Sequence, residues 1–306
     1  MSNDLYLVLD ESLAKGHATR EENFDGELGV IAGYFVRGSN IQRTRRALET
    51  IRSSFDIGED RKHHVTDVAA SEQQRARKTI FDHFDDRELS LIYEALYVQG
   101  LHNDNRRTNE LMQKARENRR SNVSIPWRPE NERLLSVIFE HVFGKAVAYA
   151  LDHFDSEINI SVITDTLDDA ILDEFRQRAT NLLAMGEPKE TQIKAYDREK
   201  NEPLVLAGRS SMTGNSFTRR LRNVTYSIAK EDSGLTFAAD VLANSVGYQL
   251  MQNVKAKGKI DLNSRAAIAG HRLEHYFYGV TDGTGMRNPS DTIYRHPGQT
   301  DGNDSI

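Results

Sequence analysis

The sequence of 306 residues predicts an α/β domain in which helices flank a mixed central sheet. Two observations lead to this prediction. Apolar runs typical of strands come first, at residues 5–9, 28–36 and 89–98, and the later part of the chain alternates strand-like and helix-like segments. Strands that open in a meander and continue as strand–helix–strand–helix are typical of a mixed sheet covered by helices.

The remaining elements follow from the spacing of apolar residues. Asn40 is a candidate N-cap for a first helix. The spacing then predicts helices at 71–84, 132–154, 168–184 and 235–254 and strands at 158–165 and 224–229. We expect residues 1–280 to form a single domain, with residues 102–155 as a helical insertion or arm and residues 281–306, rich in small polar residues, as a flexible tail.

Composition excludes several classes of protein. With 38% hydrophobic and 28% charged residues, the chain is neither collagen-like nor wholly disordered. The lack of cysteine excludes disulfides, thiolate zinc sites, iron–sulfur clusters and cysteine nucleophiles. Apolar runs are shorter than the ~20 residues that cross a membrane, and the start does not resemble a secretory signal, so we expect a cytoplasmic protein without a membrane partner. The net charge of -6 gives no overall attraction to nucleic acid.

Three aspartates are candidate metal ligands. Asp10 and Asp165 each follow an apolar strand, and parallel neighbouring strands would bring both carboxylates to one edge of the sheet. Like charges this close repel unless a proton or a cation lies between them, and Mg²⁺ favours carboxylate oxygens. Asp240 lies in a helix that is apolar nearly all round, where a carboxylate is costly unless it is paired or metal-bound. Each residue also has a structural explanation, as a turn former, a helix cap or the partner of an arginine.

Three short motifs carry a resemblance to a known family. The segment Asp10-Glu11-Ser12, followed by an apolar strand that contains glycine, and the segment Glu231-Asp232-Ser233-Gly234-Leu235, leading to Ala239-Asp240, resemble the opening and the close of a bacterial RNase H-like family, domain-of-unknown-function family 3800. Asp165 falls at the strand-end aspartate between them. The resemblance spans roughly residues 5–250 and implies an RNase H-like fold and a nuclease with a Mg²⁺ or Mn²⁺ site. Such a nuclease is expected in mobile elements or as a defence or toxin-like effector.

The resemblance also implies roles for individual residues. In RNase H-like nucleases two cations about 4 Å apart flank the scissile phosphate. Asp10 would bridge both ions, Asp165 would hold one and Asp240 the other. His64 would carry a proton or contact the phosphate, with an ordinary structural histidine as the alternative. Family members show a glutamate directly before the basic residue that His64 matches, and this chain does not, so the fourth ligand stays open between Glu11, Asp67 and His63.

Substrate binding requires local positive charge. The segment 209–222 has no acidic residue and contains Arg209, Arg219, Arg220 and Arg222, which predicts a phosphate-binding loop. A second group of arginines lies between Arg37 and Arg52. A third lies at 106–133, where acidic residues intervene and a solvated helix face is the stronger interpretation.

The function that we predict is metal-dependent hydrolysis of RNA or DNA. A catalytically inert module that binds nucleic acid or a protein is the alternative, and hydrolysis of a small phosphate ester is a weaker one. A homo-oligomer is compatible with each. His271 and His275 have a spacing that can chelate zinc, but no third ligand is evident. The chain has no glycine-rich nucleotide-binding motif, which argues against an ATPase or a dinucleotide enzyme.

Overall fold

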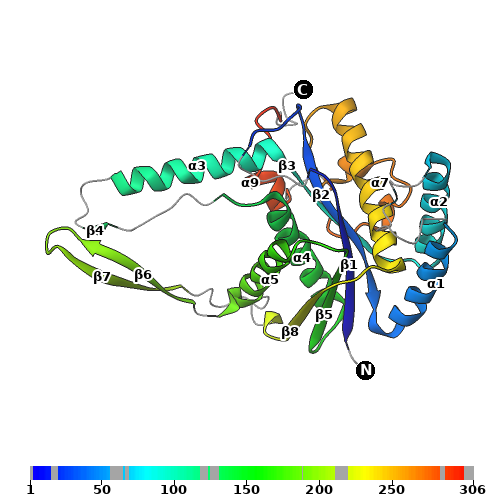
Figure 1. Cartoon of the computed structure of the whole chain (residues 1–306), viewed down its shortest axis with the longest axis horizontal. Coiled ribbons are helices and arrows are strands. Elements are labelled where there is room, and N and C mark those ends of the chain that lie inside the picture. The colour runs from blue at the N-terminus through cyan, green and yellow to red at the C-terminus, as the bar shows by residue number, and fades with distance from the viewer. Residues whose placement is uncertain are drawn as a thin grey trace.

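A five-stranded mixed sheet forms the centre of the computed structural model (Figure 1). The structure describes residues 3–14, 20–55, 65, 69–117, 123–124, 131–187, 189–210, 220–282 and 287–299. The strand order is β3-β2-β1-β5-β8. The middle strand β1 is antiparallel to β2 and parallel to β5, β2 is antiparallel to β3, and β5 is parallel to β8. The strand bounds are Asp4–Leu13 (β1), Leu28–Arg37 (β2), Leu91–Tyr97 (β3), Ile158–Thr164 (β5) and Val224–Lys230 (β8).

Helices cover both faces of this sheet, and each face has its own apolar core. On β1, Val8 belongs to the core beneath α1, α2, α7 and the short α8, whereas Leu7 and Leu9 belong to the core beneath α4 and α5. This follows from the alternation of side chains along a strand. The prediction of an α/β fold with a mixed central sheet flanked by helices is confirmed. The helix bounds are Ile41–Ser53 (α1), Ala70–Asp86 (α2), Leu134–His153 (α4), Asp169–Leu183 (α5), Gly234–Lys257 (α7) and Arg265–Ile268 (α8).

An arm projects from this body, and its composition differs from our expectation of a helical insertion at 102–155. The helix α3 (Val98–Glu117) and a small sheet of order β4-β6-β7 extend to the left in Figure 1. The strands of this sheet are Val123–Ser124 (β4), Lys189–Asp197 (β6) and Glu202–Ser210 (β7). The helix α4, which we placed in the arm, instead packs its apolar residues against the central sheet. The arm therefore combines two segments that are distant in sequence.

The helix α4 is also long and apolar enough to cross a membrane by composition. Within the protein, 72% of its most apolar window is buried. It lies between the sheet and α5, and it contacts apolar side chains from both. Its hydrophobicity is therefore that of a core helix enclosed on several sides.

The C-terminal segment differs from the flexible tail that we expected over residues 281–306. Residues 287–299 are described and packed, and they include the short helix α9 (Pro289–Ile293). Ser290, Asp291 and His296 are buried. The small polar residues that suggested disorder serve here as hydrogen-bonding partners for buried groups. Three single turns of 3-10 helix complete the described elements, at Gly38–Asn40, Ala184–Gly186 and Glu274–Tyr276.

Candidate functional site

Asp10 and Asp165 occupy neighbouring positions on adjacent parallel strands. Leu9 and Thr164 are the last register partners between β1 and β5, and the two aspartates are the next residues on their strands. Both aspartates are buried. We expected Asp10 to follow its strand directly. Instead it lies within β1, because the strand continues to Leu13 through its pairing with β2. The carboxylates nevertheless lie at one edge, since the parallel pairing ends there.

The helix α7 brings Asp240 to the same place. Ser233 begins the helix with a capping box, in which its hydroxyl accepts from Leu235 N at 3.2 Å and Thr236 Oγ1 accepts from Ser233 N at 3.1 Å. The helix lies so close to β1 that a Cβ added at Gly247 would stand 3.0 Å from Leu13. Asp240 lies about two turns before Gly247 on the same helix, and it is buried. The small residues of α7 therefore permit the approach that places a carboxylate against the sheet.

The electrostatics of Asp10 show that four carboxylates gather here. Burial raises the pKa of Asp10 well above its usual value, and the nearby negative charges of Glu11, Asp240 and Asp165 raise it further, as does a hydrogen bond with Glu11. Every cause acting on Asp10 from the described residues acts in this direction. The site therefore favours either a proton on Asp10 or a cation among the carboxylates.

Backbone donors orient two of these carboxylates. Val65 N donates to Asp240 Oδ2 at 2.6 Å, and Thr166 N donates to Asp165 Oδ1 at 2.6 Å. Val65 is buried in the core beneath α7, and it is the residue next to His64 in sequence. His64 itself, with the alternative ligands His63 and Asp67, lies outside the described residues. Of the three candidates for a fourth ligand, Glu11 is therefore the one whose position beside Asp10 is defined.

Sequence reasoning did not select Glu231 as a site residue, although it follows the neighbouring strand β8. Its N–H donates to Thr164 O at 2.9 Å, which places it at the strand end next to Asp165. Its carboxylate pairs with Arg45, and Arg52 pairs with Asp232 at 2.7 Å. The sequence signal that could have identified Glu231 is its position just after the apolar strand at 224–229. Glu231 and Asp232 therefore differ from the Asp10 group, because their charges are matched by two arginines of α1.

A tighter cluster of potential ligand atoms occurs elsewhere. Among the described residues, Glu22, Asp25 and His296 offer ligand atoms that all lie within 4.8 Å of one another, a spacing that the three aspartates do not reach. This cluster is internally satisfied. His296 Nδ1 accepts from Gly298 N at 2.9 Å, which leaves Nε2 to donate to Glu22 at 3.2 Å, and Asp25 pairs with Lys259. It holds the C-terminal segment in place.

The zinc spacing of His271 and His275 also has a structural explanation. His271 is buried, its Nδ1 accepts from Leu273 N at 3.1 Å, and its Nε2 lies 3.0 Å from Ser245 Oγ. Burial lowers the pKa of His271 to about 4, which keeps the ring neutral. His271 therefore serves as a hydrogen-bonded core residue.

Of the arginines in the predicted phosphate-binding loop, the two with described side chains, Arg220 and Arg222, do not lie beside the carboxylates. Arg219 and the side chain of Arg209 are outside the described part of the chain. Arg220 and Arg222 precede β8, at the end that pairs with Ile158, about 20 Å along the strand from the edge with Asp165. Arg220 Nη2 donates to the carbonyls of Leu151 and Phe154 at the C-terminus of α4. Its guanidinium group therefore caps a helix and is not available to bind a phosphate in this arrangement.

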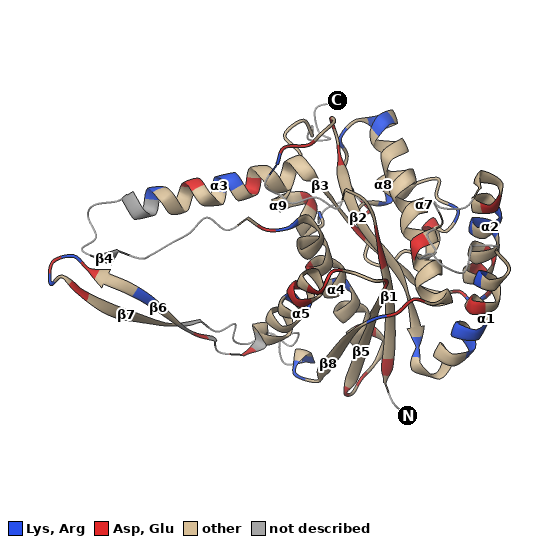
Figure 2. Ribbon diagram, in the orientation of Figure 1, with Lys and Arg blue, Asp and Glu red and all other residues tan. Residues whose placement is uncertain are grey.

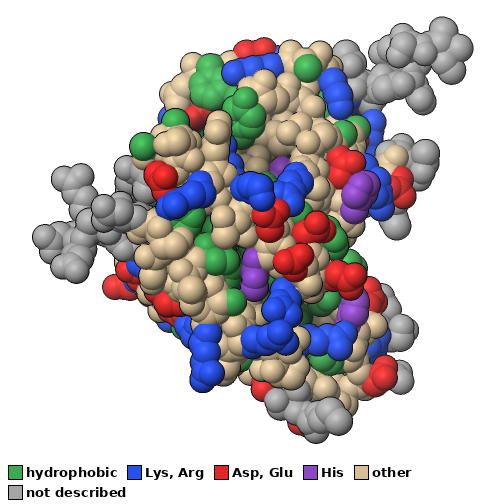
Figure 3. All heavy atoms as spheres, turned by 90° about the vertical axis from the view of Figure 1, so that its right-hand side faces the viewer, with side chains coloured by type: hydrophobic (Ala, Val, Ile, Leu, Met, Phe, Trp, Pro, Cys, Tyr) green, Lys and Arg blue, Asp and Glu red, His purple; other side chains and the backbone are tan. Residues whose placement is uncertain are grey.

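Other basic residues are interspersed with acidic ones. Figure 2 shows both signs along α3 and the small sheet of the arm, and Arg106 lies 3.9 Å from Glu110 on the exposed surface of α3. Figure 3 looks onto the face that carries α1, α2 and α7, where basic side chains gather in groups with acidic side chains between them. Both surfaces thus carry charges of mixed sign within the described residues, and the charged side chains of α3 form a solvated helix face.

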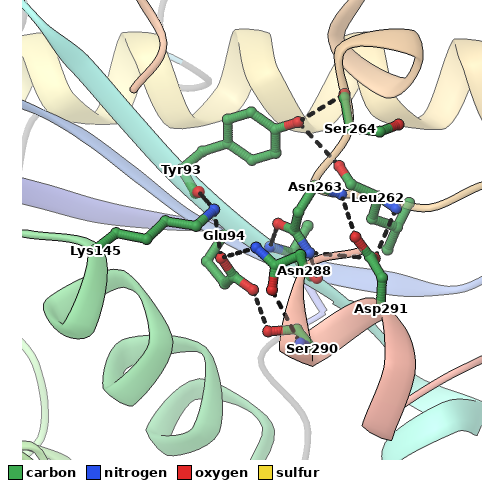
Figure 4. Close-up of polar contacts among 10 residues, drawn as sticks. Tyr93, Glu94, Lys145, Leu262, Asn263, Ser264, Asn288, Ser290 and Asp291 are labelled. Carbon is green, nitrogen blue, oxygen red and sulfur yellow. Dashed lines mark hydrogen bonds and ion pairs between the residues drawn. The ribbon is translucent and has the colours of Figure 1, made fainter. Parts of the chain in front are cut away.

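A second buried polar centre lies at the outer edge of β3, two strands from Asp10, where the side chain of Asn263 pairs with the backbone of Ala95 (Figure 4). Glu94 on β3 is fully buried, with Lys145 Nζ 2.6 Å from its Oε2 and the hydroxyl of Ser290 donating to its Oε1. Asp291 accepts from the backbone N–H groups of Leu262 and Asn263 at 2.8 and 3.1 Å. This centre ties α9 to the sheet and has a structural role.

The comparisons with known proteins do not assign the chain to a family. No family model matches it, and no curated protein matches it significantly. The resemblance to family 3800 therefore depends on the motifs, and the functional argument depends on the geometry of the carboxylates.

Proposed function

We propose that this protein is a divalent-metal-dependent phosphodiesterase that acts on nucleic acid, with an RNase H-like arrangement of its site. One observation carries the proposal. Asp10 is buried among Glu11, Asp165 and Asp240, and no described basic side chain offsets the repulsion at Asp10. A carboxylate group of this kind fits a hard cation such as Mg²⁺ or Mn²⁺, which takes oxygen ligands. The mixed sheet with flanking helices is compatible with an RNase H-like fold.

In this proposal Asp10, Asp165 and Asp240 hold the metal, and Glu11 is the fourth donor. A divalent cation at such a site supplies a nucleophilic hydroxide and stabilises charge on the phosphate. The chain itself fixes the donors. Thr166 N and Val65 N each bind one carboxylate oxygen, so these carboxylates are oriented before any ligand arrives. His64 remains the proposed proton carrier, since its neighbour Val65 is anchored to Asp240.

A binding module without catalytic activity is the alternative, and two observations favour it. The aspartate oxygens are more widely spaced than those of the Glu22 cluster, and Arg220 and Arg222 lie at the far edge of the sheet. A module of this kind would bind nucleic acid in a salt-sensitive manner without cleaving it. The distinction is therefore one of turnover, which an assay can measure directly.

The test is cleavage of labelled RNA, single-stranded DNA and duplex DNA with Mg²⁺ or Mn²⁺. We expect the wild type to cleave at least one substrate, EDTA to stop cleavage, and Asp10→Asn and Asp240→Asn to reduce it to background. The matched control is Asp169→Asn, because Asp169 is an exposed acid paired with Lys230. Calorimetry should show Mn²⁺ binding that Asp10→Asn removes. A wild type that neither binds Mn²⁺ nor cleaves any of the substrates would refute the proposal, and binding of nucleic acid without cleavage would favour the alternative.

A further inference from the structure

A pocket of about 230 Å³ opens between the C-terminal end of β2, the start of α1 and the end of α2. Tyr149 of α4 and Phe35 of β2 form part of its wall, with their rings stacked 4.1 Å apart. The pocket lies at the opposite edge of the sheet from Asp10. Arg37 lines it and pairs with Leu5 in β1, five residues before Asp10, which corresponds to about 17 Å along the strand.

The charged lining of the pocket is predominantly basic. Arg37, Arg43 and Arg87 line it, and all three are exposed. Within the described residues none of them forms an ion pair; Arg37 lies over the ring of Phe154, 5.8 Å from its centroid. The acidic residue of the lining is Glu88. This contrasts with Arg45 and Arg52 of the same sequence cluster, whose charges are matched by Glu231 and Asp232.

Further donors in the lining lack partners among the described residues. His83 Nε2 is buried with no hydrogen-bond partner among the described residues. Ser90 Oγ accepts the hydroxyl of Tyr149 at 3.1 Å, so its own proton is left to donate. Asn40 stands at the N-terminus of α1, and its side chain makes no capping hydrogen bond. The first turn of α1 contains no acidic residue, so the positive end of the helix dipole is not neutralised locally.

We propose that this pocket binds the phosphate group of a phosphate monoester. Guanidinium groups recognise phosphate oxygens in a bidentate manner, and three of them surround a concave site that also offers hydroxyl and imidazole groups. The volume is below the roughly 300 Å³ at which pockets for drug-sized ligands begin, so it suits a phosphate with the atoms next to it. The phosphate can come from a small ester or from the end of a nucleic-acid strand. The site is independent of the proposed metal centre.

The test is titration calorimetry on the full chain. The probes are a nucleoside 5′-monophosphate, the same nucleoside without phosphate, and a short oligonucleotide with either a 5′-phosphate or a 5′-hydroxyl. We expect both phosphorylated probes to bind at least tenfold more tightly than their counterparts, and added salt to weaken binding. Tighter binding of the mononucleotide identifies a small ester as the source, and tighter binding of the phosphorylated oligonucleotide identifies a strand end.

Substitutions locate the site. Arg43→Gln and Arg87→Gln should each weaken binding at least tenfold. Because both side chains are exposed, the two variants should keep the wild-type melting temperature. The matched control is Arg222→Gln, since Arg222 is exposed at the same edge of the sheet but outside the pocket, and it should change affinity less than twofold. Asp10→Asn should bind as the wild type does, which separates this site from the metal centre. Equal binding of the phosphorylated and unphosphorylated probes, or full affinity in both pocket variants, would overturn the proposal.

Discussion

Replacing Lys145 with methionine tests the buried ion pair that holds the C-terminal segment. Lys145 Nζ lies 2.6 Å from Glu94 Oε2, and it donates to the carbonyl of Tyr93 at 2.9 Å. The side chain of Glu94 is 0% exposed and that of Lys145 is 13% exposed. Methionine keeps much of the volume and removes the charge. Glu94 is then left with the hydroxyl of Ser290 and a distant amide of Asn288, at 3.5 Å, as partners.

The expected loss follows from burial. Removal of one partner of a buried ion pair costs about 3–5 kcal/mol, because the remaining charge is neither solvated nor paired. The exposed pair of Lys78 and Asp82 is the control, since its distance is nearly the same, at 2.7 Å, while its side chains are 75% and 39% exposed. Lys78→Met should cost at most about 0.5 kcal/mol. The difference between the two substitutions therefore measures the effect of burial at constant geometry.

Urea denaturation provides the assay, with the free energy of unfolding extrapolated to water. The double variant Glu94→Leu/Lys145→Met should be more stable than Lys145→Met alone, because no unpaired charge is left in the core. A loss below about 1 kcal/mol for Lys145→Met, or a double variant as unstable as the sum of its single substitutions, would refute the reasoning.

Three further predictions concern stability. Burial and the charge of Glu94 raise the pKa of Asp291 to about 7 from 3.8, so the folded protein favours the protonated form. The free energy of unfolding should therefore fall by up to about 4 kcal/mol between pH 4 and 7. Asp291→Asn should flatten this pH dependence in urea titrations at several pH values, and an unchanged slope would contradict the prediction. Asp10→Asn should stabilise the protein by about 1 kcal/mol in EDTA at neutral pH, because the pKa of Asp10 is raised by burial and repulsion, and thermal melts that show a loss would be inconsistent with this. Gly234→Ala should destabilise by about 1–3 kcal/mol, since its Cβ would lie 2.4 Å from the backbone of α1, whereas Gly208→Ala has open space and should be near neutral; equal melting temperatures would disprove the contact.

The periodicity of the sequence determined most of the central elements. The predicted strand at 224–229 and helix at 235–254 correspond to β8 at Val224–Lys230 and α7 at Gly234–Lys257. These segments carry their signals locally, as alternation along a strand or as the Ser233 cap before an apolar helix. The β6–β7 hairpin was not predicted; its strands lie in the arm, and the described side chains of β7 are exposed or half-buried.

For the candidate site, the sequence indicated the carboxylates but not their counterions. Asp10, Asp165 and Asp240 could be selected because each is an acid at a strand end or in an apolar helix. The sequence did not indicate which arginines would pair with acidic residues and which would not. Arg45 and Arg43 are two residues apart, yet one pairs with Glu231 and the other lines the pocket at the far edge of the sheet. Successive helical residues point in different directions, so the packing of α1 decides each partner.

The amino-acid sequence by itself thus determined the class of fold, the lack of thiol chemistry and the acids that stand out from apolar surroundings. Only the tertiary structure decided that Glu11, Asp165 and Asp240 all act on Asp10, that Glu94 needs Lys145, and that residues 287–299 are packed. The physical reason is that hydrophobic periodicity is a property of neighbouring residues in the chain. Charge pairing and burial depend instead on residues that are distant in sequence, and folding alone brings these together.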